Sequence, residues 1–134
     1  MMTGEQAVTT LVVYLKRYTD IPVFKFDDNH GQSKLYISVH HQIWVYGKTV
    51  NDDNIVNINI HAPKLTTGGA DRTTLMDMLR EVQSIIPTDT NDEESETLYI
   101  DGAHYVITSI SSPVEDRSDD TYFYNVRVKV IFHK

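Results

Sequence analysis

The sequence contains no cysteine at all. This absence excludes a disulfide framework, a thiol nucleophile, a CxxC redox pair and any zinc site built on thiolate ligands. It does not by itself fix the compartment in which the protein works.

Basic residues are also scarce. The chain has 12 Lys and Arg residues against 19 Asp and Glu residues, which gives a formal net charge of -7. Affinity for duplex DNA comes mainly from clustered Lys and Arg. The charge balance therefore argues against a surface that grips DNA.

Long apolar runs are missing as well. No window approaches the roughly 18 apolar residues of a membrane-spanning helix. Polar residues between Glu5 and Thr10 interrupt the first apolar stretch, which would be unbroken in a signal peptide. We therefore expect a protein that is synthesised and folded in a cytoplasm, with no membrane partner.

Two amphipathic helices are predicted. Thr3 and Gln6 have the spacing of a capping box, and apolar residues then recur at helical spacing as far as Tyr18. The second helix begins near residue 71, where Asp71 or Thr73 could cap it, and it ends before Pro87. Its predicted buried stripe comprises Leu75, Leu79, Val82 and Ile86.

Several strands surround these helices. In "NIVNINIHAP", residues 54–63, apolar residues alternate with polar ones, and residues 121–134 alternate in the same way. Residues 35–46 are also β-prone, but His41 falls on the apolar side of that strand. Either a β-bulge re-aims the chain there or the side becomes mixed. Asp101-Gly102 between two β-prone runs predicts a tight hairpin.

The order of elements predicts an α+β fold, with a mainly antiparallel sheet and two helices packed on one face. At 134 residues and 40% hydrophobic content, residues 1–134 should form a single domain. Residues 88–97 carry five carboxylates and no base, so we expect a solvated, mobile loop. Residues 111–120 are predicted to form a second polar loop.

The sequence offers no motif for catalysis, for a cofactor or for a metal. The six histidines lack the paired spacing of metal ligands, and no serine lies in a GxSxG elbow. We therefore expect a protein that is not an enzyme and has no cofactor. Two alternatives stay open: a small monomeric binding module with an exposed aromatic patch around Trp44, and a metal-dependent hydrolase.

The polar side of "NIVNINIHAP" is the most unusual feature, because asparagine is depleted in strands. Amides and imidazoles exchange hydrogen bonds without the desolvation cost of buried charges, so this side suits a wet contact between folded proteins as well as it suits water. The candidate subunit interface comprises Asn57, Asn59, His61, Tyr36 and Trp44.

The element order resembles a known family. An N-terminal helix, a "VFKFDDN" entry, β-rich segments, the strand–loop–helix run "INIHAPKLTTGGADRTTLMDMLREVQSII" and a final hairpin are similar to the tail terminator or head-tail completion (neck) proteins of long-tailed bacteriophages. The resemblance implies a structural protein of the virion that forms a homo-oligomeric ring, commonly a hexamer, at the end of the tail tube. It implies tail tube and connector proteins as partners.

In such a ring DNA passes through without specific binding, and carboxylates in the channel would repel its phosphates. The candidate channel-lining residues are Asp89, Asp92, Glu93, Glu94 and Glu96, with Asp116, Asp119 and Asp120 as second choice.

Overall fold

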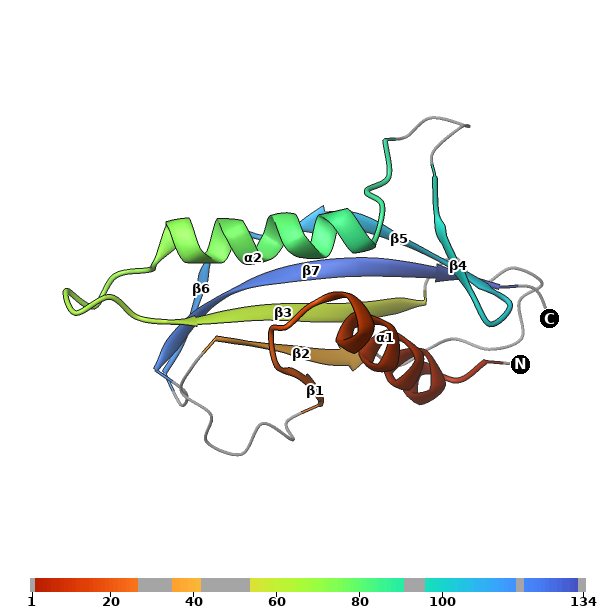
Figure 1. The fold of residues 1–134 in the computed structure, drawn as a ribbon, viewed down its shortest axis with the longest axis horizontal. Coiled ribbons are helices and arrows are strands. Elements are labelled where there is room, and N and C mark those ends of the chain that lie inside the picture. The colour runs from red at the N-terminus through yellow and green to blue at the C-terminus, as the bar shows by residue number, and fades with distance from the viewer. Residues whose placement is uncertain (1, 27–34, 42–53, 91–95, 118–119, 133–134) are drawn as a thin grey trace.

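The computed structural model describes residues 2–26, 35–41, 54–90, 96–117 and 120–132. These residues form two helices and a seven-stranded sheet (Figure 1). In chain order the elements are α1 (Gly4–Tyr18), β1 (Val23–Lys25), β2 (Tyr36–His41), β3 (Ile55–Pro63), α2 (Arg72–Ile85), β4 (Leu98–Ile100), β5 (Ala103–Ile110), β6 (Val114–Asp116) and β7 (Thr121–Ile131).

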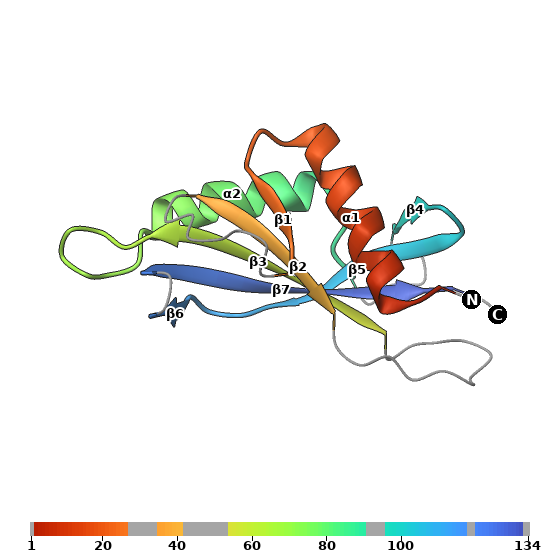
Figure 2. The same ribbon diagram turned by 90° about the horizontal axis from the view of Figure 1, so that it is seen from below.

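The strand order is β1-β2-β3-β7-β5-β4, with β6 paired to β7 off this path. Strands β1 and β2 are parallel, whereas the other described strand pairs are antiparallel. Both helices lie on the same face of the sheet, as the view from below shows most clearly (Figure 2). The predicted α+β fold, mainly antiparallel with helices packed against the sheet, is confirmed.

The helix ends follow their sequence signals. Thr3 caps α1 in a complete capping box with Gln6, and the side chain of Asp71 caps α2 by accepting a hydrogen bond from the Thr74 amide. The N-cap of α2 is therefore Asp71 rather than Thr73. Burial of the predicted stripe holds α2 on the sheet.

Alternation in the central strands builds the core. Val56, Ile58 and Ile60 of β3 are completely buried against the helices, together with Val126 and Val128 of the neighbouring β7. The polar residues between them therefore lie on the opposite face, since successive side chains of a strand point to opposite sides. Neither of the two described helices covers that face, which is called the helix-free face below (Figure 2). This face carries the candidate site.

The two histidines of β2 show how that strand ends. The pairing of β2 with β3 is regular from Tyr36 to His41, so no bulge intervenes and the helix side of β2 becomes mixed. His41 fits there because α1 begins with Gly4. A Cβ atom at Gly4 would lie 2.5 Å from Nδ1 of His41.

The structure confirms the hairpin predicted at Asp101-Gly102 but differs from the loop predicted for residues 111–120. Asp101 and Gly102 both have positive φ, 49° and 86°, as the predicted tight hairpin between β4 and β5 requires. Residues 111–120, predicted to be a loop, instead contain β6, which pairs with the start of β7. The prediction was wrong here because backbone pairing compensates for the low β-propensity of the polar side chains.

Candidate subunit-contact face

The helix-free face of the sheet is organised in rows that run across the strands. Register places Tyr36, His61 and Phe123 in one row and Ser38, Asn59 and Asn125 in the next. A third row contains His40, Asn57 and Arg127. The face thus changes from aromatic through amide to basic along the strands.

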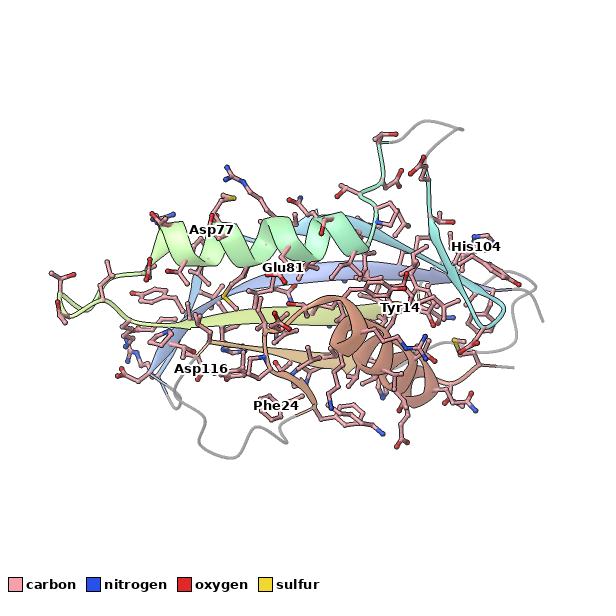
Figure 3. The ribbon with its side chains drawn as sticks, in the orientation of Figure 1. Tyr14, Phe24, Asp77, Glu81, His104 and Asp116 are labelled. Carbon is pink, nitrogen blue, oxygen red and sulfur yellow. The ribbon has the colours of Figure 1, made fainter. Side chains whose placement is uncertain are left out.

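The aromatic row is a stack of rings. The His61 imidazole lies 4.2 Å from the Tyr36 ring, at an interplanar angle of 9°, and 4.9 Å from the Phe123 ring. Phe24 of β1 adds an edge contact to Tyr36 at 6.0 Å (labelled in Figure 3). Offset ring pairs of this kind stabilise by about 0.5–1.5 kcal/mol each. The row therefore stiffens this end of the sheet.

This stack changes the role of two predicted interface residues. His61 is only 4% exposed and Tyr36 only 3%. In this conformation neither side chain is available to touch a neighbouring subunit. Their rings stack across the strands, a contact that the linear sequence does not reveal.

Both ring nitrogens of His61 reach a hydroxyl group. Nδ1 lies 3.0 Å from Oγ1 of Thr121, which is completely buried, and Nε2 lies 3.4 Å from Oγ of Ser38. The Ser38 hydroxyl also lies 3.1 Å from Nε2 of His40. A buried polar group is tolerated only when it finds such partners, so this network explains why a histidine is stable inside the layer.

The amide row satisfies itself in a similar way. Nδ2 of Asn125 donates to Oδ1 of Asn59 at 2.7 Å and to Oδ1 of Asn57 at 3.3 Å. The Asn125 backbone amide donates to Oγ of Ser111 at 3.0 Å. For Nδ2 of Asn57 and Asn59 no partner is found among the described residues, and both residues are half-buried. They therefore retain donors for a molecule that covers the face.

Trp44, the remaining predicted interface residue, lies outside the described residues, as do Asp92, Glu93, Glu94 and Asp119. Of the predicted channel-lining residues, Glu96 is exposed. Asp89 is not in a free loop, because its backbone amide donates to the Ile107 carbonyl at 2.8 Å and Thr88 forms a bridge with β5. The start of the predicted mobile loop 88–97 is thus attached to the sheet.

Of the second-choice acidic residues, Asp120 belongs to a charged cluster around Lys64. Its Nζ lies 2.7 Å from Oε2 of Glu115 and 3.3 Å from Oδ1 of Asp120, and its side chain is largely buried. The hydrogen bond to Glu115 raises the pKa of Lys64, and the same bond lowers the pKa of Glu115. This cluster fastens the β6–β7 turn to the end of β3. Asp116 lies half-buried in β6 nearby.

Other kinds of site receive little support. Within the described ranges no group of three or more His, Asp or Glu residues could hold a metal ion. Neither described helix combines the length and apolar character needed to cross a bilayer. The hollows between α1 and the β4–β5 hairpin are lined mainly by threonines, other α1 side chains and Asp101.

Comparison with known proteins adds no assignment: no protein-family model and no curated protein sequence matches this chain.

Proposed function

We propose that this protein is a structural assembly subunit of a long-tailed bacteriophage or prophage. In this proposal identical copies form a ring, such as a hexamer, that ends the tail tube and joins it to the head connector. The virion neck or tail end would be its location, after assembly in the host cytoplasm. The resemblance in element order supplies the family, and the helix-free face supplies the physical support.

The observation that carries the proposal is the amide row. Asn125 binds both Asn57 and Asn59, so the row has already exchanged part of its water for internal hydrogen bonds. Covering such a surface costs less free energy than covering unpaired polar groups, because each polar group that is buried without a hydrogen-bond partner costs about 1–3 kcal/mol. The remaining Nδ2 donors can bind carbonyl groups of a neighbour, as polar interfaces require.

Rigidity of the face supports the same proposal. The aromatic row fixes the strands on one side of the amides, and the central position of β3 pairs its backbone on both sides. A partner that binds a preformed surface does not have to order it first, which makes each contact more favourable. A ring whose subunits must meet at a constant angle needs this property.

The charge of the chain is compatible with a ring that DNA must traverse. The net charge of -7 disfavours retention of DNA, and Glu96 of the proposed channel lining is an exposed carboxylate. Asp89 and Glu96 flank residues 91–95 in the sequence and belong to the proposed lining. Phosphates would slide past such a surface because the interaction is repulsive.

Replacing both Asn57 and Asn59 by Lys tests the proposal. The double variant should fold, with a stability loss of about 1–2 kcal/mol because Asn125 loses its acceptors. It should fail to form rings on tail tubes, since two like charges would be buried at each contact. Light scattering, negative-stain imaging and the yield of infectious particles measure this outcome.

The matched control is Gln83→Lys with Ser84→Lys, which adds the same charge to exposed positions of α2. This control should assemble normally. If Asn57→Lys/Asn59→Lys completes particles at the yield of the control, the face is not the contact. A wild-type protein that stays monomeric with tail tubes would favour the binding-module alternative, and metal-dependent turnover in a hydrolase screen would favour the enzyme alternative.

A further inference from the structure

Two unlike features lie at opposite ends of the long axis of the molecule. The turn of residues 64–70, between β3 and α2, extends beyond the start of α2, whereas the tip of the β4–β5 hairpin and the start of α1 lie at the other end (Figures 1 and 2). Unlike patches at opposite ends favour head-to-tail contacts, which close into rings when the rotation allows.

The turn is a preformed projection. The Leu65 amide donates to the Gly69 carbonyl at 2.9 Å, and the Gly68 amide donates to the Leu65 carbonyl at 2.8 Å. Gly68 has φ of 88°, which side chains rarely tolerate. Leu65 itself is 45% exposed. The turn therefore presents an apolar side chain on a backbone that loses little entropy when it binds.

A groove lies between α1 and the β4–β5 hairpin. It consists of two hollows of about 580 and 290 Å³ that share Thr9, Thr10 and Asp101. The larger hollow is open to solvent and has a volume within the roughly 300–1,000 Å³ of ligand clefts. The apolar lining of the two hollows comprises Met2, Val13, Tyr14 and Ile100.

Charge favours the same pairing. Glu5, which also pairs with Lys25 at 3.5 Å, and Asp101 line the larger hollow, and Arg72 is exposed at the start of α2, beside the turn. Arg17 lines only the smaller hollow. A cation next to the inserted turn would thus meet the acidic end of the groove, which orients the approach of two chains.

We infer that residues 64–70 of one copy insert Leu65 into the groove between α1 and the β4–β5 hairpin of the next copy. This inference rests on the proposed ring and names a contact within it. The contact is heterologous, because the turn and the groove are different surfaces of the same chain.

The absence of cysteine allows a direct test. Purified Leu65→Cys and Thr9→Cys chains are mixed at high concentration under mild oxidation. A covalent heterodimer should form several-fold faster than in a mixture of Leu65→Cys with Gln83→Cys, which places the second thiol on the exposed face of α2. The double variant Leu65→Cys/Thr9→Cys should give a ladder of covalent multimers, because one thiol lies in the turn and the other lines the groove of the same chain.

Equal rates in the two mixtures would overturn the inference, and so would a predominance of Leu65→Cys homodimers, which indicates a symmetric contact. If cross-linking fails but rings form on tail tubes, the ring closes through another surface and the proposed function survives. If the ladder forms but the protein neither binds tail tubes nor affects particle yield, the contact is correct and the proposed function is wrong.

Discussion

His61→Ala is the substitution for which the structure gives the clearest magnitude. It removes two ring contacts, to Tyr36 and Phe123, and leaves the hydroxyl of the completely buried Thr121 without its nitrogen partner. An unpaired buried hydroxyl costs about 1–3 kcal/mol and each ring pair about 0.5–1.5 kcal/mol. The hydroxyl and the two ring pairs together give an expected loss of about 2–6 kcal/mol in the free energy of unfolding, measured by urea denaturation.

His104→Ala is the matched control. His104 also lies in a strand, 4.8 Å from the Tyr99 ring, and its Nδ1 lies 2.7 Å from Oγ1 of Thr97, but the side chain is exposed on the β4–β5 hairpin (Figure 3). Its removal should cost less than about 1 kcal/mol, as is usual for surface substitutions.

His61→Phe separates the two contributions in His61→Ala. It keeps an aromatic ring between Tyr36 and Phe123 but cannot accept or donate at Thr121, so its loss should be about 1–3 kcal/mol. If His61→Ala is no more destabilising than His104→Ala, the aromatic row is not a buried layer and the account of this face is wrong.

Two further predictions concern polar contacts away from the aromatic row. Glu81→Ala removes the acceptor of the 2.6 Å hydrogen bond from Thr19, which joins the end of α1 to α2, and should lower stability by about 1–2 kcal/mol in thermal unfolding. Asp77→Ala, one turn earlier at an exposed position, should have little effect. Equal losses in the two variants would contradict this role of Glu81. Lys64→Met should destabilise the protein at neutral pH. The pKa of Glu115 in the folded protein is lowered from 4.5, so the stability that the ionised carboxylate contributes is lost as pH falls below 4.5. The pKa of Lys64 in the folded protein is raised from 10.5, so the stability that the charged ammonium contributes is lost as pH rises above 10.5. The stability difference between Lys64→Met and wild type should therefore shrink at both extremes, and a pH-independent difference would contradict the ion-pair explanation.

Features that depend on neighbouring residues were predictable from the sequence. The capping box of α1 and the positive φ angles of Asp101 and Gly102 follow from residues next to one another in the chain. The order of helices and alternating strands was likewise enough to predict the α+β fold.

Features that depend on distant partners were not predictable. Strand β6 contains two carboxylates, Glu115 and Asp116, beside Val114, and it pairs with β7. The fit of His41 beneath α1 depends on Gly4, and the burial of His61 depends on rings from β2 and β7. A single sequence carries the alternation of each strand but not the register between strands, and register decides which polar side chains meet.

The asparagines of β3 illustrate what register adds. Isolated in one strand, each amide would compete with the backbone for hydrogen bonds, which is one reason asparagine is rare there. Beside Asn125 of β7, the amides of Asn57 and Asn59 instead bind a side chain, so they contribute to the sheet rather than weaken it. The same pairing uses the Oδ1 atoms of Asn57 and Asn59 and leaves their Nδ2 donors for other partners. Because those donors project from a stiff central strand, a partner in the proposed ring would bind them at little entropic cost.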